Sequence, residues 1–202
     1  MGSCNGFLCL FRYNDKTDAF IFNISNPITH ECIPLPVNEE IRSPLPDFGF
    51  GFSPISDVYK VVVFANNRKR KEYCRDLKVM VLTVGFEIWR RIGKIRDTVG
   101  TTKGVFHEGH LHWVCGCNGY RPHFIRAFDV ESEHFKDLPM PPHYFNHSSI
   151  PELGVIGGSL SVSDGSTFWI MKEYGVKASW TKVLEIGYDT IDSIIGNLYK
   201  QC

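Results

Sequence analysis

Histidine and cysteine side chains gather in one short stretch of the sequence, where their chemistry would suit a metal ion. The stretch contains His107, His110, His112, Cys115 and Cys117. Zinc in proteins is held tetrahedrally by such imidazole nitrogens and thiolate sulfurs. The histidine spacing is one residue short of the His-Glu-x-x-His motif, and Cys-x-Cys is not the usual Cys-x-x-Cys knuckle. We therefore expect ordinary strand and turn residues and no metal site, with a zinc cluster as the weaker alternative.

Other patterns that could support catalysis are weak. Asp129, Glu131 and Glu133 alternate and could share a face as a carboxylate pair, although a solvated hairpin explains them better. No local motif pairs one of the seven cysteines with one of the eight histidines as nucleophile and base. No glycine-rich phosphate loop with a Walker lysine is present in the sequence. We predict a protein that is not an enzyme and that uses no cofactor.

A basic run stands out in a chain whose formal net charge is zero. It begins at Arg68, Lys69 and Arg70, and the segment from Asn66 to Lys78 holds six basic and two acidic residues. Such a run is typical of a nuclear import signal, of a contact for an acidic target, or of a solvated hairpin loop. Because the whole chain is neutral, we expect neither nucleic acid nor membrane as a partner.

Strand patterns must position these side chains. Leu111, Trp113 and Cys115 alternate with His110 and His112, so the two sets face opposite sides of one strand. Gly109 suits a tight hairpin turn before that strand. The stretch from 104 to 139 thus predicts three or four half-buried antiparallel strands, which make one small sheet.

The rest of the chain repeats this unit. Gly109 and Gly158 are 49 residues apart, each is followed two positions later by leucine, and Gly6 stands in the same relation to Leu8. A strand-only repeat of roughly 40–50 residues is typical of propeller blades, which bury their faces by stacking on neighbours. We predict an all-β fold, a kelch-like or β-propeller-like stack of about four small antiparallel sheets, whether or not its ring is complete.

The β domain is expected over residues 1–186, and the tail 187–202 differs from it. Ile191, Ile194, Ile195 and Leu198 have the spacing of a short amphipathic helix, which a truncated or shifted reading frame would also produce. The four tryptophans fall near strand positions and are expected in the core. The N-terminus lacks the features of a secretory signal, so we expect reduced thiols and a location in the cytoplasm and/or nucleus.

Recognition on such a scaffold is expected in loops, because loops vary while the strands that hold them stay rigid. Four loops are candidates, around residues 37–47, 66–78, 116–123 and 139–151. Their residue types include those enriched at protein interfaces. The predicted protein-binding residues are Arg68, Lys69, Arg70, Tyr120, Arg121, His123, His143, Tyr144 and Phe145.

A series of short phrases, in order over about residues 2–184, resembles the plant F-box-associated domain. No single phrase is specific, but the series is. The phrases are Gly2–Cys9; Ile24–Thr29 with Leu35–Pro36; Phe48–Pro54 with Asp57–Val62; Gly104–Phe106 with Leu111–Trp113; Ile125–Asp129 with Glu133–Phe135 and Leu138–Pro139; and Trp169–Val176 with Ser179–Lys182.

The resemblance implies a substrate-recognition domain of F-box proteins, which recruit a target protein to an SCF-type ubiquitin ligase. In that family an upstream F-box binds the Skp adaptor, and this chain begins at the phrase that normally follows the F-box. Skp and cullin are therefore expected as partners only if an F-box precedes the chain, and the target protein is not identified by the sequence. The alternatives are a small-ligand or glycan-binding or hydrolytic propeller domain, or a truncated product with no working role.

Overall fold

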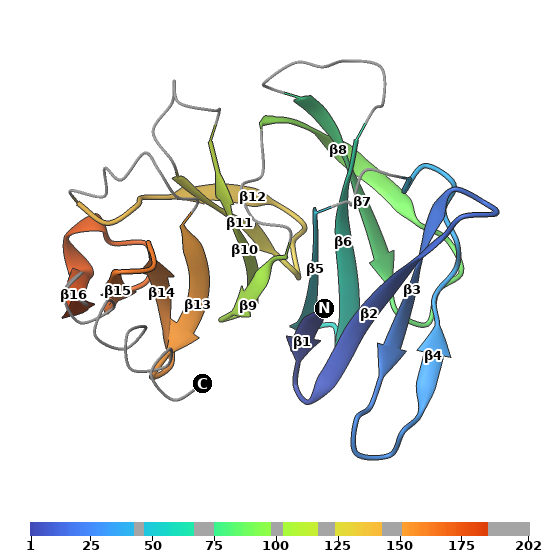
Figure 1. The fold of residues 1–202 in the computed structure, drawn as a ribbon, viewed down its shortest axis with the longest axis horizontal. Helices are drawn as coiled ribbons and strands as arrows, with labels where there is room; N and C mark the ends of the chain where they lie inside the picture. Colours follow the sequence, from blue (N-terminus) through green and yellow to red (C-terminus); the bar gives the residue numbers. More distant parts are fainter. Residues whose placement is uncertain (43–46, 67–74, 98–102, 117–123, 143–150, 186–202) are drawn as a thin grey trace, which may run out of the picture. The chain divides into compact units, whose positions relative to one another are not determined.

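The computed structural model describes residues 1–42, 47–66, 75–97, 103–116, 124–142 and 151–185. These residues form four antiparallel sheets of four strands each (Figure 1), which confirms the predicted all-β fold of about four small sheets. The chain divides into two compact units, Met1–Leu138 and Pro139–Cys202, here called unit 1 and unit 2. Among the described residues, none lies in a helix long and apolar enough to cross a membrane. The tail 187–202, whose apolar spacing suits either a short helix or a shifted reading frame, lies outside the described residues.

Unit 1 contains three of the sheets, and the strands of each follow the chain from one edge to the other. Sheet A consists of β1 (Gly2–Cys4), β2 (Phe7–Asn14), β3 (Ala19–Ser25) and β4 (Cys32–Pro34). Sheet B consists of β5 (Asp47–Ser53), β6 (Val58–Asn66), β7 (Arg75–Thr83) and β8 (Arg90–Asp97). Sheet C consists of β9 (Val105–His107), β10 (His110–Cys115), β11 (Phe124–Asp129) and β12 (Phe135–Leu138).

Unit 2 contains the fourth sheet, sheet D. Its elements are β13 (Glu152–Ile156), β14 (Ser159–Ser163), β15 (Thr167–Met171), the short 3-10 helix η1 (Lys177–Ser179) and β16 (Trp180–Glu185). Trp180 is buried and its indole Nε1 donates to the backbone oxygen of Pro139 at 3.0 Å, which ties β16 to the start of the unit. Trp169 is less buried, and the Lys182 ammonium lies 5.9 Å from its ring centroid.

The same two-residue turn joins the first two strands of sheets A, C and D. Both turn residues have positive φ in each case, as in Asn5 (48°) and Gly6 (80°) or Glu108 (46°) and Gly109 (73°). Such pairs of left-handed residues make type I′ turns, whose twist matches the twist of the strands. The third turn is formed by Gly157 and Gly158 (56° and 77°). The glycine repeat in the sequence therefore marks a structural repeat.

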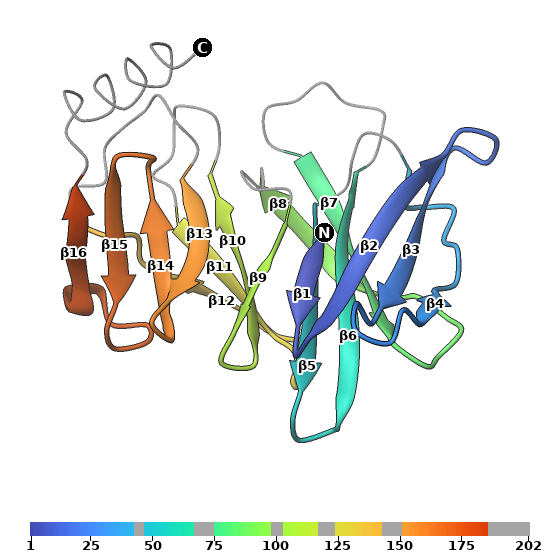
Figure 2. The same cartoon turned by 60° about the horizontal axis from the view of Figure 1, so that its bottom comes forward.

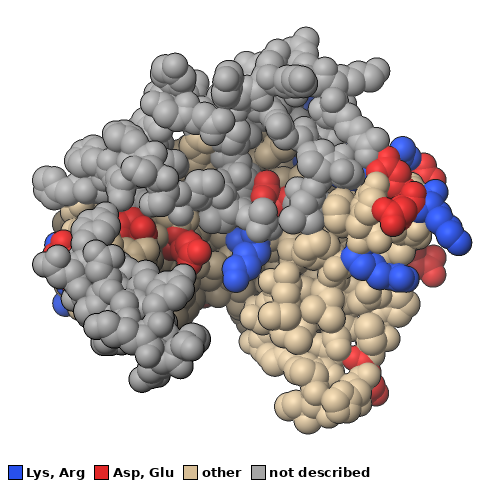
Figure 3. All heavy atoms as spheres, viewed as in Figure 1, with Lys and Arg blue, Asp and Glu red and all other residues tan. Residues whose placement is uncertain are grey.

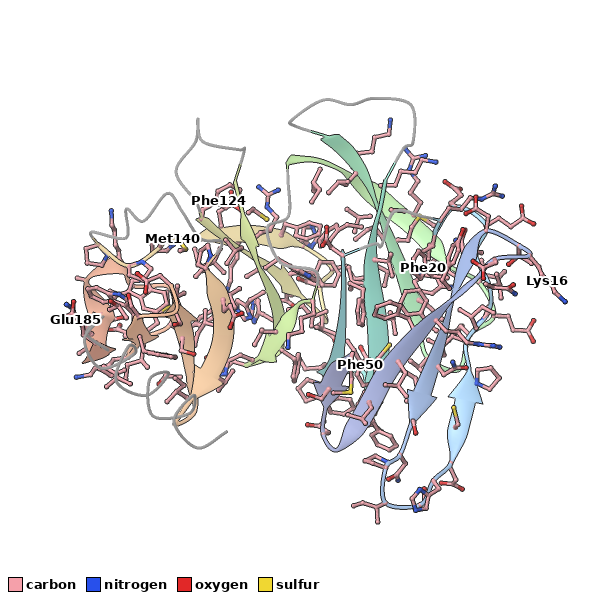
Figure 4. The ribbon with its side chains drawn as sticks, in the orientation of Figure 1. Lys16, Phe20, Phe50, Phe124, Met140 and Glu185 are labelled. Carbon is pink, nitrogen blue, oxygen red and sulfur yellow. The ribbon has the colours of Figure 1, made fainter. Side chains whose placement is uncertain are left out.

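Sheet B is buried on both faces at the centre of unit 1. Val61 and Val63 pack on one side with Phe22, Ile24 and other side chains of sheet A. Val62 and Phe64 pack on the other side with Trp113 and other side chains of sheet C. The uninterrupted apolar runs of β6 and β7 account for this, since a strand covered on both sides needs no polar alternation. Figure 4 shows Phe50 inside the unit, while Lys16 projects from the β2–β3 turn.

The prediction of half-buried strands is wrong for β10. The predicted alternation is present, since Leu111 and Trp113 belong to the core shared with sheet B. The opposite face is buried as well, because His112 and Val114 each have 0% of their surface exposed. A histidine on that face reads as polar and exposed in a sequence, but a neutral imidazole with a hydrogen-bond partner can be buried.

Glycines let sheets B and C approach closely along β5. A Cβ atom on Gly49 would lie 2.7 Å from Trp113, and one on Gly51 would lie 2.8 Å from Phe106. The Gly104 backbone nitrogen donates to the Phe48 oxygen at 2.6 Å, next to a parallel bridge between Phe48 and Lys103. The alternation of phenylalanine and glycine in β5 predicts such close backbone approach, and the structure confirms it.

Candidate interaction surface

The two ends of unit 1 differ in how they connect the strands. In each of the three sheets of unit 1, connections of two to six residues join the first strand to the second and the third to the fourth, so these connections share one end, here called the turn end. Figure 2 shows the β1–β2, β5–β6 and β9–β10 turns together at the lower end of the unit. The strand ends that lead into the predicted recognition loops therefore lie at the opposite end, here called the loop end.

All nine predicted protein-binding residues fall in ranges that the structure does not describe: 67–74, 117–123 and 143–150. Their roles stay predictions. The strands that flank the first two ranges are described and pair with each other along their length. The predicted insertion 66–78 is too long, because β6 includes Asn66 and β7 begins at Arg75. Leu77 accounts for the difference, since it is 5% exposed and belongs to the core shared with sheet C.

The described part of the first loop is anchored to the scaffold. Ile41 is 1% exposed, and its backbone oxygen accepts a hydrogen bond from the Phe20 nitrogen at 3.1 Å. The Asn38 side-chain oxygen accepts from the Glu40 nitrogen at 2.8 Å, which shapes the turn. Glu40 forms an ion pair with Lys78 on β7, and this contact lowers the pKa of the Glu40 carboxyl. At the loop end, the β4–β5 connection thus contacts sheet B.

A buried ammonium group joins sheet B to sheet C near the turn end. Lys60 on β6 is 6% exposed, and its Nζ donates to the Val130 oxygen at 2.7 Å. The same Nζ lies 2.9 Å from Oε1 of Glu133, which also accepts from Nη2 of Arg90 at 2.5 Å. Burial acts to raise the pKa of Glu133, but the hydrogen bonds from Arg90 and Lys60 outweigh it, so the pKa is lowered.

Glu131 adds a second link between the same two sheets. Its carboxylate accepts hydrogen bonds from the hydroxyls of Ser53, which is fully buried, and Ser56, at 2.6 Å for the latter. These hydroxyls lower the pKa of Glu131. Asp129 closes the turn itself by accepting from the backbone nitrogens of Glu131 and Ser132 at 2.8 and 3.0 Å. These carboxylates therefore link two sheets and shape a turn. The sequence suggested either a catalytic carboxylate pair or a solvated hairpin, and neither interpretation includes this structural role.

The histidines lie together on one face of sheet C. The ring centroid of His112 is 6.1 Å from that of His110 and 6.3 Å from that of His107. Nδ1 of His112 lies 3.1 Å from the Val105 oxygen, and burial lowers the pKa of this histidine to about 3. Cys115 lies on the opposite face, in the core with Trp113, and Cys117 lies outside the described residues.

Within the described ranges, no three histidine, cysteine, aspartate or glutamate side chains are arranged to hold a metal ion. Three of the four tryptophans predicted in the core are buried there: Trp89, Trp113 and Trp180. No local sequence pattern indicates the link made by Lys60, because its partners lie about seventy residues away along the chain. An isolated lysine inside the apolar run of β6 is the one local hint, since a lysine is rarely buried without a partner.

Comparison with known proteins places the chain among a group of plant sequences. The family described as "F-box associated beta propeller domain" matches residues 1–192. F-box protein At3g07870 of Arabidopsis thaliana is 32% identical over 220 residues, which cover 93% of this chain and 50% of that protein. Two further relatives come from the same plant. F-box/kelch-repeat protein At3g23880 is 23% identical over 92% of this chain and 52% of that protein. F-box protein CPR1 is 28% identical over 92% of this chain and 51% of that protein. The chain spans about half the length of these relatives.

Proposed function

We propose, from the premise that this chain belongs to the family of F-box associated β-propeller domains, that it recognises a target protein for ubiquitination. In this proposal the target binds at the loop end, and an SCF-type ubiquitin ligase transfers ubiquitin to it. Skp and cullin subunits join through an F-box where one is present in the same protein. The proposed role is non-catalytic, because the chemistry is performed by other subunits.

The observation that carries the proposal is the match of the family over residues 1–192, together with relatives whose names call them F-box proteins. The scaffold supports it in physical terms. Sheets A, B and C pack into a core with shared faces, so the strand ends at the loop end are held at fixed positions. A rigid frame that carries variable loops is the arrangement on which binding residues are commonly displayed.

The alternative of a hydrolytic propeller needs carboxylates that converge on a substrate. The carboxylates that sequence reasoning singled out are otherwise engaged. Glu131 accepts from Ser53 and Ser56, while Glu133 binds Lys60 and Arg90. These contacts favour protein recognition over hydrolysis.

Affinity capture from plant extract tests the proposal. The chain would be captured alone and with an F-box fused in front of residue 1, after proteasome inhibition, and partners identified by mass spectrometry. We expect the two baits to share one or more specific partners, with Skp and cullin only on the fusion. The variant Tyr120→Ala/Arg121→Ala should lose the shared partner. The matched control Glu87→Ala, which changes an exposed residue in the β7–β8 turn at the opposite end, should retain it.

Two results would contradict the proposal. Recovery of the folded chain without any shared partner would show that it does not recognise a target in that extract. Retention of the partner by the loop variant, with loss in Glu87→Ala, would place recognition at the wrong end. Circular dichroism of each bait before capture separates these outcomes from failure to fold.

A further inference from the structure

The outer edge of sheet B combines an open strand with an excess of positive charge. In the strand order, β8 is last, so its outer side pairs with no described strand. Its eight residues include four basic and one acidic. On the face of the molecule seen in Figure 3, acidic and basic side chains of the described residues are interspersed. The edge is therefore locally basic in a chain of zero formal net charge.

Three cations lie on one face of this edge. Lys94 stands directly opposite Lys78 in the β7–β8 register, and Arg91 stands opposite Met80 two positions away along β7. Like charges directly opposite each other are unfavourable. Glu40 is the carboxylate near them, and it is paired with Lys78. Arg91 and Lys94 are exposed, and neither forms an ion pair within 4.0 Å among the described residues.

A bulge sets the spacing of the two exposed cations. The register shifts between Val79 and Met80, so Arg91 and Lys94 share a face although three positions separate them. Measured along β7 they are two residues apart, which is about 7 Å on a strand. The same distance separates alternate side chains of an extended peptide. Gly93 lies between them, and a Cβ there would meet nothing within 4 Å, so no described side chain covers the strand at this position.

From these features we propose that β8 binds an acidic, extended segment of a partner protein, which adds to sheet B as a fifth strand. Backbone groups on an open edge pair with an incoming strand, and side chains on alternate positions supply selectivity. The cations repel another copy of β8 and attract acidic side chains at alternate positions. An extended polypeptide fits better than nucleic acid, because only a polypeptide offers amide donors and acceptors at strand spacing.

The proposal rests on the proposed function, since it states the chemistry of one recognised partner. A labelled ten-residue peptide alternating glutamate and threonine is the probe, followed by fluorescence anisotropy with the full chain at two salt concentrations. Controls are the same peptide with lysine for glutamate, the glutamate peptide N-methylated at alternate residues, and single-stranded oligothymidine. We expect saturable, salt-sensitive binding of the glutamate peptide, with slower amide hydrogen exchange in β8.

Charge reversal tests the residues. Arg91→Glu/Lys94→Glu should weaken peptide binding about tenfold or more, because two favourable contacts become repulsive. The matched control Lys16→Glu reverses an exposed charge at a turn of sheet A, where Figure 4 shows it pointing away, and should leave affinity unchanged. If the double reversal fails to fold, Arg91→Gln/Lys94→Gln should show a smaller loss in the same direction.

The inference is overturned if the glutamate peptide fails to bind, if the N-methylated peptide binds equally well, or if oligothymidine binds as tightly. Failure of the two proposals can be told apart. A captured partner that stays bound to the Arg91→Glu/Lys94→Glu chain supports target recognition and contradicts recognition through β8. Specific peptide binding by a chain that captures no partner supports the edge site and contradicts the proposed function.

Discussion

The contact between Lys60 and Glu133 offers a quantitative test of how sheet B is joined to sheet C. The side chains are 8% and 17% exposed, so both charges are largely withdrawn from water. Removing one partner of a buried pair leaves an uncompensated charge and costs about 3–5 kcal/mol. We take the lower end, about 3 kcal/mol, for Glu133→Gln, because Lys60 keeps its hydrogen bond to the Val130 oxygen.

A double-mutant cycle separates the pair from its surroundings. Lys60→Met and Glu133→Gln should each destabilise unit 1, but the double variant should cost less than their sum. We expect a coupling free energy of about 2 kcal/mol, within the range for residues in direct contact. The exposed pair of Arg42 and Glu39, whose side chains are 41% and 84% exposed, is the matched control in the same unit. Its coupling should be about 0.5 kcal/mol or less.

Urea denaturation followed by circular dichroism measures these free energies of unfolding, and thermal melts provide a second reading. For a unit of this size, about 3 kcal/mol corresponds to a fall in Tm of roughly 10 °C. Hydrogen exchange of β6 and of the β11–β12 turn would confirm that the loss is local to the contact. Strict additivity of the two single variants, or an equal coupling in the exposed control pair, would refute the account of Lys60 as a buried, charge-paired link.

Three further predictions concern the packing and the titration of unit 1. Gly49→Ala should destabilise the unit by about 1–3 kcal/mol, because the added methyl would overlap Trp113, while Gly93→Ala should stay within about 0.5 kcal/mol; urea denaturation distinguishes them. Burial lowers the pKa of His112 to about 3, below the ordinary value of 6.5. The free energy of unfolding should therefore fall as the pH drops from about 6.5 toward 3, because only the unfolded chain takes up a proton at this histidine in that range. The variant His112→Leu should show a weaker pH dependence there, measured by thermal melts at a series of pH values. Because its pKa is lowered in the folded state, the Glu133 carboxylate contributes stability above its ordinary pKa of 4.5. This contribution should vanish as the pH falls through the folded-state pKa of Glu133. Between neutral and acidic pH, Glu133→Gln should therefore lose less stability than the wild type.

The sequence predicts the sheets of this fold because their signals are local. Asn5-Gly6 and Gly157-Gly158 sit where type I′ turns form, and alternation assigns Trp113 to the core before any contact is known. The burial of the other face of β10 has no local signal, because alternation records which residues share a face and not how much of each face is covered. The sequence therefore indicates only that His112 is a strand residue, and does not predict that its side chain is buried.

The candidate interaction surface is likewise predictable from the sequence only in part. Gaps between strand patterns locate the loops, and the strand ends that flank the loops around 37–47, 66–78 and 116–123 lie at one end of unit 1, as topology requires. The basic edge of β8 was missed, because a bulge brings Arg91 and Lys94 onto one face and changes the expected alternation. Arg68, Tyr120 and the other loop residues stay predictions.

The glycines of β5 also fix the register of this strand against the neighbouring sheets. Gly49 and Gly51 face sheet C, whereas Phe48 and Phe50 face sheet A. A slip of one residue would turn a phenyl ring toward Trp113, where even a methyl group is too large. The contact between β5 and sheet C is therefore compatible with only one register of β5. Because this packing fixes where the strands end, loops of very different length and sequence can be exchanged at the loop end without moving the strand ends that carry them.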